Sequence, residues 1–428
     1  MLIAIITVLS RGMPVLALPL LTASLTLEEY GLFAIYLLLI NLFSPIATAN
    51  IAAGIIREGI AFPHRGDKLL QIINIYSLII ALLVFCVWAI SSINNQYIFV
   101  AILIITAGQQ ECLVSHFRSK YQDIKFFWIS VSRALALAVP VIATYAGFLD
   151  LEGLLGVYCV GYVFTSLVFV PISLWNRSIT IKHYVYLKMT LVYCIFLIPY
   201  TVGQWVVSSS TRAFLGGVDS LENAGLYAIS YTLASPIILV FSVCGVVFGR
   251  SILADPDKWL ENSEFRHRVL YGLIFVGFLC TLLSLSSIYF DYQSFQLIRY
   301  YSPEMILVAG VISMSLLFQC MYTIYGGILF YKKVTKILAR NSLIIAGLHL
   351  VHSFILIKLF SIIGAVASVC VSYFLVYFLS FLDAKKETQG KLINSATDVK
   401  IIVIGLVLQI LLISYFYSLW DELYSLNH

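Results

Sequence analysis

Long apolar segments separated by short polar loops fill almost the whole chain. A helix needs roughly 20 apolar residues to cross the hydrocarbon core of a bilayer, and about 12 segments reach that length. They form two sets of six, at 2–23, 30–56, 71–92, 97–117, 126–147 and 153–175, and at 189–214, 225–249, 269–290, 304–330, 338–360 and 363–383. A further apolar run lies at 401–420. The pattern predicts an all-α polytopic membrane protein of about 12 to 13 spans.

A short motif occurs twice and indicates that the chain is two related halves. Residues 27–36 read LEEYGLFAIY, and residues 221–230 read LENAGLYAIS. In each copy we expect an acidic turn to lead into a helix that begins near Gly31 or Gly225. Because an even number of spans separates the copies, the two halves begin on the same side of the membrane.

This arrangement predicts three regions. We expect an N-terminal six-helix bundle at 1–180 and a C-terminal six-helix bundle at 181–385, related by a pseudo-twofold axis along the membrane normal. Residues 386–428 are expected to form a cytoplasmic linker and an extra C-terminal helix, which either spans the membrane or is re-entrant.

Composition and charge agree with lipid as the solvent and set the orientation. The chain is 61% hydrophobic and 11% charged, whereas soluble domains are about a quarter charged. If the N-terminus is cytoplasmic, 21 of the 26 Lys and Arg residues fall in cytoplasmic loops, and the outward loops carry acidic residues such as Glu28, Asp150 and Asp219. The positive-inside rule therefore predicts a multi-pass protein whose N-terminus is cytoplasmic.

Four cations lie inside or at the ends of predicted helices. Arg11 is near the middle of the first helix, Arg133 is about two turns into the fifth, and Arg212 and Lys358 are near the outer ends of the seventh and eleventh. A cation in hydrocarbon costs at least ~2.5–3.5 kcal/mol, so it normally faces a water-filled cavity or a partner. We expect a cationic cavity that suits an anionic cargo such as a pyrophosphate headgroup. The alternatives are structural pairing for Arg11 and snorkelling to an interface for the other three.

Intramembrane anions are scarcer, and Glu111 in the fourth helix is the clearest. Glu111 shares a helix face with Arg118, and Arg133 of the next helix is expected to reach the same face. Two roles stay open for Glu111: pairing with a neighbouring cation, or binding a coupling proton or sodium ion. At the inner end of the second helix, Arg57 and Glu58 are either a loop ion pair or a cytoplasmic gate.

Motifs of cofactor-dependent or catalytic chemistry are not found in the sequence. There is no GxxxxGK[ST] phosphate loop, no HExxH and no GxSxG, so we expect neither an enzyme nor a chain with its own ATPase. His349 and His352 lie at i,i+3 in an apolar helix without a nearby carboxylate, which does not favour a metal site. No cofactor and no nucleic-acid partner are expected.

The start of the chain resembles a known family of transporters. Ser10-Arg11-Gly12, Leu18-Pro19-Leu20-Leu21-Thr22 and Leu27-Glu28-Glu29-Tyr30-Gly31 resemble the start of bacterial O-antigen and polysaccharide flippases, in the multidrug/oligosaccharidyl-lipid/polysaccharide exporter superfamily. Residues 222–227, ENAGLY, are similar to their internal repeat. The resemblance spans essentially the whole chain through helix count, loop lengths and two-bundle layout. An odd helix count would depart from the family, whose members more often have an even number.

The resemblance implies a fold and a transport activity. It implies a V-shaped pair of bundles around a cationic central cavity, with Arg11 as a substrate contact. The implied activity moves undecaprenyl-pyrophosphate-linked oligosaccharide from the cytoplasmic to the periplasmic leaflet by alternating access, driven by a proton or sodium gradient or by the membrane potential. The implied partners are this lipid-linked substrate, membrane lipids, an O-antigen polymerase and a chain-length regulator.

Three alternatives remain open. A related flippase would move a capsule unit, a teichoic acid precursor or lipid II. A drug/cation antiporter of the same superfamily should carry more intramembrane carboxylates than Glu111. An O-antigen polymerase or ligase should present a large periplasmic loop, which the apolar pattern does not leave room for.

Overall fold

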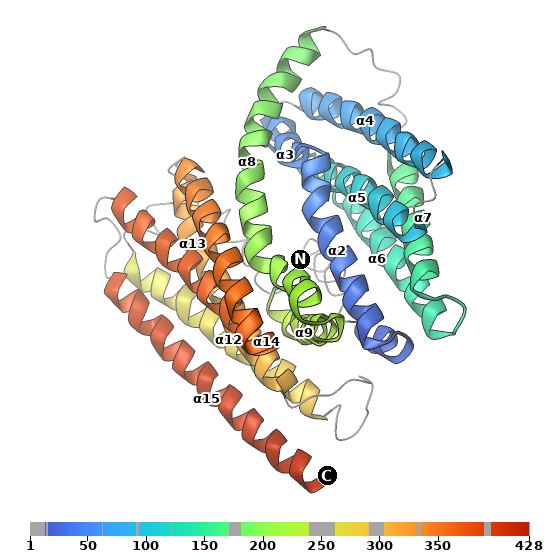
Figure 1. Ribbon diagram of the computed structural model, residues 1–428. Coiled ribbons are helices and arrows are strands. Elements are labelled where there is room, and N and C mark those ends of the chain that lie inside the picture. The colour runs from blue at the N-terminus through green and yellow to red at the C-terminus, as the bar shows by residue number, and fades with distance from the viewer. Residues whose placement is uncertain are drawn as a thin grey trace. The chain divides into compact units, whose positions relative to one another are not determined.

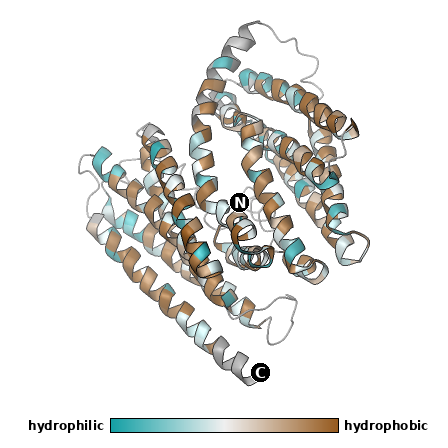
Figure 2. Ribbon diagram, in the orientation of Figure 1, coloured by the Kyte–Doolittle hydropathy of each residue, from teal (hydrophilic) through white to brown (hydrophobic). Residues whose placement is uncertain are grey.

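The computed structural model is built of helices (Figure 1) and describes residues 13, 16–61, 63–90, 94–120, 122–170, 181–238, 262–290, 304–331, 335–388 and 395–427. Within these ranges there is no β-strand, and 10 helices are long and apolar enough to cross a membrane. Hydrophobic residues run along the middle of the C-terminal helix α15, Ser395–Asn427, as Figure 2 shows. The chain is a multi-pass, all-α membrane protein, which confirms the predicted fold class.

Contacts between residues divide the chain into two compact units. The first comprises Met1–Met13 and Phe33–Val202, and the second comprises Pro14–Leu32 and Gly203–His428. Helix α8, Ile181–Phe214, contributes residues to both units. The predicted boundary near residue 180, set by helix count along the chain, stays a prediction.

The first unit is organised around α5. Its helices are the later part of α2 (Leu27–Ala47), α3 (Ile51–Ala61), α4 (Pro63–Ile90), α5 (Asn95–Ser119), α6 (Asp123–Tyr145), α7 (Leu151–Phe169) and the first part of α8. Helix α5 packs against α3, α4, α6 and α7. Its Cys112, Leu113 and Phe117 are buried with Ile55 of α3 and Leu70 of α4 in one apolar core. This central position makes α5 the helix that reaches most of its neighbours.

The predicted helix at 30–56 is broken in the structure. α2 ends at Ala47, and α3 begins at Ile51. Between them Ala49 and Asn50 have φ angles of 49° and 53°, and the Asn50 amide donates to the Pro45 carbonyl at 2.6 Å. A left-handed conformation costs roughly 1–2 kcal/mol for an ordinary residue but less for Asn. The apolar pattern alone did not reveal this turn, because Ala49 gives no turn signal.

The second unit contains the predicted eleventh and twelfth helices as one hairpin. Its elements are helical residues 16–24, the start of α2, the end of α8, a π-helical turn at Leu215–Asp219, α9 (Leu221–Ala234), α12 (Ser263–Phe290), α13 (Glu304–Tyr331), α14 (Thr335–Glu387) and α15. Within α14, Ser361 has φ 50° and ψ −129°. Hydrogen bonds join the residues on either side of this turn, as between Asn341 and Asp383 at 2.6 Å. α14 is therefore two antiparallel arms, as the sequence predicted for 338–360 and 363–383.

The two copies of the repeated motif cross each other in the second unit. A Cβ atom added to Gly31 of α2 would lie closer than 3.0 Å to the Leu221 carbonyl oxygen. A Cβ added to Gly225 of α9 would lie equally close to the Leu27 carbonyl oxygen. The contact is reciprocal, since each glycine meets the residue that begins the other copy. Glycine lets two membrane helices approach this closely, so Gly31 and Gly225 each provide the space that the other helix backbone occupies.

A side-chain cap precedes each copy, and each helix begins earlier than predicted, at Leu27 rather than residue 30 and at Leu221 rather than residue 225. The Thr26 amide donates to the Glu29 carboxylate at 2.9 Å, and the Glu29 amide donates to the Thr26 hydroxyl at 3.2 Å. In the second copy the Asn223 amide donates to the Ser220 hydroxyl at 3.1 Å. These bonds satisfy amides that have no partner in the first turn of a helix, so both helices start at the Leu residue of the motif.

The extra C-terminal helix packs as part of the second unit. α15 contains an apolar stretch, Ala396–Leu419, long enough to cross a membrane. It lies beside α12 and α13 (Figure 1). Gly405 of α15 meets Ile274 of α12, and Gly310 of α13 meets Ile413 of α15. In each contact a glycine on one helix faces an isoleucine on the other, and the absence of a Cβ atom on glycine allows the helices to pack closely.

Candidate functional site

Three consecutive polar residues in α5 reach three different helices. Successive residues in a helix point about 100° apart, so Gln109, Gln110 and Glu111 face different directions. Gln109 donates to Asn74 of α4 at 3.1 Å. Gln110 is fully buried and donates to the Tyr162 carbonyl of α7 at 2.9 Å. Glu111 faces α6. This run ties the central helix of the first unit to its neighbours.

Glu111 forms an ion pair with Arg133 of α6. Their carboxylate and guanidinium approach to 2.8 Å, with side chains that are 52% and 24% exposed. The Tyr162 hydroxyl also hydrogen-bonds Arg133, and Tyr158 hydrogen-bonds Tyr162. The structure thus brings together the two residues that the sequence placed on one face. The ion pair partly neutralises the charge of Arg133.

Arg212 of α8 is surrounded by tyrosines. Its guanidinium carbon lies 4.2 Å from the ring centroid of Tyr231, a cation–π distance. Tyr30 of α2, Tyr227 of α9 and Tyr373 of α14 lie close enough to interact electrostatically with it. Arg212 Nε and the Tyr227 hydroxyl are buried and have no hydrogen-bond partner among the described residues. The site therefore offers a fixed positive charge and two unused polar groups, which suits an oxyanion such as a phosphate oxygen.

The other predicted site residues lie apart from these two clusters. Lys358 is exposed on the first arm of α14, just before the turn at Ser361. The Arg118 guanidinium lies 6.0 Å from the ring centroid of Phe126, and the side chain is exposed. Snorkelling along an apolar surface accounts for both positions.

Two predicted residues fall outside what the structure describes. Arg11 lies outside the described residues, and so does the side chain of Arg57. Glu58 accepts a hydrogen bond from Arg65 of α4 at 3.3 Å. Both partners belong to the first unit, so this contact is an ion pair across the short connection between α3 and α4.

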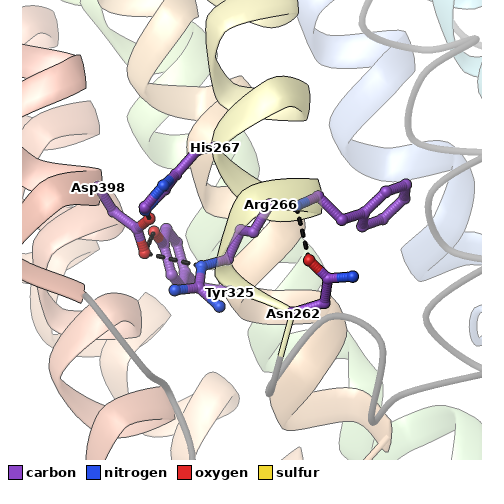
Figure 3. A network of polar contacts seen from close by, with 6 residues as sticks. Asn262, Arg266, His267, Tyr325 and Asp398 are labelled. Atoms are coloured by element: carbon purple, nitrogen blue, oxygen red, sulfur yellow. Dashed lines mark hydrogen bonds and ion pairs between the residues drawn. The ribbon is translucent and has the colours of Figure 1, made fainter.

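Sequence reasoning missed a buried ionic network in the second unit. Arg266 of α12 and Asp398 of α15 have fully buried side chains, and Arg266 Nε lies 2.8 Å from Asp398 Oδ2. Tyr325 of α13 donates to the same carboxylate at 3.2 Å, and His267 Nε2 lies 3.0 Å from Asp398 Oδ1. Figure 3 shows these side chains converging on Asp398. The network joins three helices and ties α15 to the rest of the unit.

A signal for this network was present in the sequence. The charge pattern places Arg266 among the cytoplasmic loop cations, and Asp398 falls in the predicted linker of residues 386–428. Each residue nevertheless precedes a long apolar run by about one turn, and both runs were predicted to start on the same side of the membrane. Opposite charges that lie at the same depth in the membrane on two adjacent helices can form an ion pair. The sequence did not show that α12 and α15 are adjacent.

Comparison with known proteins identifies solved structures that share this fold. No protein-family model matches the chain, and no curated protein matches its sequence. The chain is similar in structure to the lipid II flippase MurJ in an inward closed conformation, with a TM-score of 0.59 and 16% identity over 99% of this chain and 98% of that chain.

Two transporter structures of another kind are also similar. An inward-facing multidrug resistance MATE family transporter of the MOP superfamily matches with a TM-score of 0.60 and 12% identity, over 91% of this chain and 96% of that chain. A MATE structure in complex with MaL6 matches with a TM-score of 0.61 at the same identity and coverage. At such low identity the likeness concerns the fold alone, and this chain shares the fold of these transporter structures.

Proposed function

We propose that this protein is a flippase for lipid-linked oligosaccharide. It moves undecaprenyl-pyrophosphate-linked O-antigen units across the bacterial inner membrane by alternating access, with its N-terminus in the cytoplasm. The fold and the resemblance of the repeated motif support a transporter. The proposed class of cargo, a phosphorylated lipid, is supported by the surroundings of Arg212. Its guanidinium lies in an apolar helix among tyrosines and has an N–H group without a hydrogen-bond partner among the described residues.

The chemistry of the Arg212 site suits a phosphorylated cargo bearing sugars. A guanidinium binds phosphate through paired N–H groups in a fixed plane. Tyrosine rings supply flat apolar faces beside polar hydroxyls, which match the alternating apolar and hydroxylated surfaces of a sugar ring. In this proposal Arg212 binds a phosphate oxygen while the surrounding tyrosines contact the first sugar.

Arg133 plays a second role in the proposal. Its charge is shared with Glu111 at 2.8 Å, so a phosphate must compete with a carboxylate for it. A bound anion at Arg133 would release Glu111 to take up a cation or a proton. Exchange of this kind couples an anionic cargo to an ion gradient without a metal or cofactor.

Complementation tests the proposal. The chain is expressed in a strain that lacks its own O-antigen flippase, and surface polysaccharide is scored for the wild type, Arg212→Ala and Arg212→Lys. One charged hydrogen bond is worth about 1.5–3 kcal/mol, so we expect Arg212→Ala to lower export about tenfold or more, with partial recovery in Arg212→Lys. Arg268→Ala is the matched control, because Arg268 is 80% exposed on α12 and should export like the wild type at equal membrane amounts.

Two results would overturn the proposal. One is wild-type export from Arg212→Ala, which would leave the cargo without its proposed contact. The other is failure of the wild type, present in the membrane, to restore export in strains lacking O-antigen, capsule or lipid II flippases. In that second case drug resistance in an antiporter-deficient strain would identify the competing function, which the MATE fold allows.

A further inference from the structure

The short connection between α5 and α6 carries two cations, each of which lies over an aromatic ring of the other helix. The Arg118 guanidinium carbon of α5 is 6.0 Å from the ring centroid of Phe126 in α6. Lys125 Nζ of α6 is 5.9 Å from the ring centroid of Phe117 in α5. Both rings are buried in the apolar core of the first unit. These are cation–π distances, so rings that are themselves fixed hold the two charges at the edge of that core.

The two cations differ from their neighbour Lys120 in their lack of an acidic partner. Lys120, in the same connection, forms an ion pair with Asp67 of α4. Among the described residues no such pair involves Arg118 or Lys125, and both side chains are exposed. Asp123 begins α6, but residues two positions apart on a helix do not face each other. The positive charge of this surface is therefore available to a ligand outside the chain.

An apolar stripe on the surface of α6 begins beside these cations. Its side chains are between 54% and 72% exposed and lie at Ile124, Trp128, Leu135, Val139 and Ile142. At 100° per residue they fall within about 60° of one another, and at 1.5 Å per residue they extend over about 27 Å. This length is close to the ~30 Å of the hydrocarbon core. Since α6 is long and apolar enough to span a membrane, Ile124 lies at the edge of the hydrocarbon, next to the lipid phosphates.

Cations beside an apolar stripe suit an amphipathic ligand with a negative charge. A guanidinium donates paired N–H groups to phosphate oxygens, and an ammonium attracts them as a point charge. An acidic protein or a soluble phosphate would neutralise Arg118 and Lys125 but leave the stripe uncovered. A zwitterionic lipid covers the stripe but brings a cation of its own close to both residues, which repels them. An anionic phospholipid satisfies both features.

We propose that the surface formed by Arg118, Lys125 and the apolar stripe of α6 is a binding site for one anionic phospholipid. The phosphate of the lipid binds to the two cations, and an acyl chain lies against Ile124 and Trp128. The lipid belongs to the leaflet that the α5–α6 connection faces, which the charge pattern predicts to be the cytoplasmic one. The site lies in the first unit and does not involve the cargo contact at Arg212.

The two cations set the expected selectivity of the site. One basic side chain near a membrane surface favours an anionic lipid by about fivefold. Two such side chains should therefore favour phosphatidylglycerol over phosphatidylcholine by about 25-fold. A single variant, Arg118→Gln or Lys125→Gln, should lose about fivefold of this preference.

Tryptophan fluorescence of the full-length chain in lipid nanodiscs tests this inference. Trp128 is 55% exposed on the stripe, and brominated acyl chains quench a tryptophan that they contact. The contribution of Trp128 is the difference between the wild type and Trp128→Phe. With about 10% brominated phosphatidylglycerol in phosphatidylcholine, a 25-fold preference fills about three quarters of the sites with the quencher. The same share of brominated phosphatidylcholine should occupy only about a tenth of them.

Three variants separate the two charges from other effects. Arg118→Gln combined with Lys125→Gln should reduce quenching of Trp128 by brominated phosphatidylglycerol to the level seen with brominated phosphatidylcholine. Arg118→Lys combined with Lys125→Arg keeps both charges and should retain most of the preference. Arg268→Gln is the matched control, because it removes an exposed cation that is paired with Glu264 at 3.4 Å, and it should quench like the wild type. An SDS titration of each variant establishes that it is folded.

Three results would overturn the inference. Equal quenching by the two brominated lipids in the wild type would mean that the stripe contacts only ordinary bilayer lipid. An undiminished preference in the double glutamine variant would mean that Arg118 and Lys125 do not select the lipid. Loss of phosphatidylglycerol quenching in excess glycerol 3-phosphate would identify a site for soluble phosphates instead of a lipid. The measurements need no cargo, so their outcome is independent of the proposed function.

Discussion

Breaking the buried pair between Arg266 and Asp398 should destabilise the second unit strongly. Both side chains are fully buried, and their atoms are 2.8 Å apart. Removing one partner of such a pair leaves an uncompensated charge, at about 3–5 kcal/mol. We therefore expect Arg266→Met and Asp398→Leu each to lower the free energy of unfolding by about that amount.

The double variant distinguishes the pair from its two members. Arg266→Met with Asp398→Leu replaces both charges by apolar groups, which is often close to neutral. The hydroxyl of Tyr325 loses its acceptor in this variant, which costs about 1–3 kcal/mol. The double variant should therefore be more stable than either single variant.

The assay follows unfolding of the purified chain in detergent as SDS is titrated. Cys280 of α12 and Cys320 of α13 are buried and react with a thiol-specific fluorophore only after this region opens. Arg268→Ala is the control on the same helix, since Arg268 pairs with Glu264 in an exposed i,i+4 contact and should change stability by less than about 1 kcal/mol. Destabilisation by the double variant that equals the sum of the single variants would refute the reasoning.

Two further predictions concern backbone geometry. Gly31→Ala should destabilise the chain by about 1–3 kcal/mol in the same SDS titration, because the new methyl group would overlap the Leu221 carbonyl; unchanged stability would mean that α2 and α9 do not cross there. Ala49→Gly should stabilise the chain by up to about 1 kcal/mol, because Ala49 has a φ of 49° that glycine adopts without strain, whereas Ala52→Gly within α3 should be destabilising. A loss of stability in Ala49→Gly would contradict the left-handed turn.

Much of the helical architecture was predictable from apolar run length. Lipid requires each spanning backbone to satisfy its own hydrogen bonds, so a run of the right length specifies a helix. The α14 hairpin was predicted for this reason, and so was the C-terminal helix α15. The break at Ala49 was not, because a two-residue turn inside an apolar run leaves the hydropathy pattern unchanged.

The candidate site was only partly predictable. The sequence identified Glu111, Arg133 and Arg212 as charges in apolar helices, and placed the first two on a shared face. It did not reveal that Arg212 meets tyrosines of three other helices, because such contacts depend on how helices far apart in the chain pack. The ion pair between Arg266 and Asp398 could not be predicted for the same reason.

The measurement that tests the central claim most directly is movement of a purified cargo between leaflets. Proteoliposomes containing undecaprenyl-pyrophosphate-linked oligosaccharide are treated with an external enzyme that modifies only sugars exposed on the outside. With the wild-type chain we expect all of the cargo to become accessible, and with Arg212→Ala we expect movement to slow about tenfold or more, while Arg268→Ala behaves like the wild type. If, with the wild-type chain, the enzyme modifies only the cargo of the outer leaflet, as it does in protein-free vesicles, the claim that this chain moves lipid-linked oligosaccharide is contradicted.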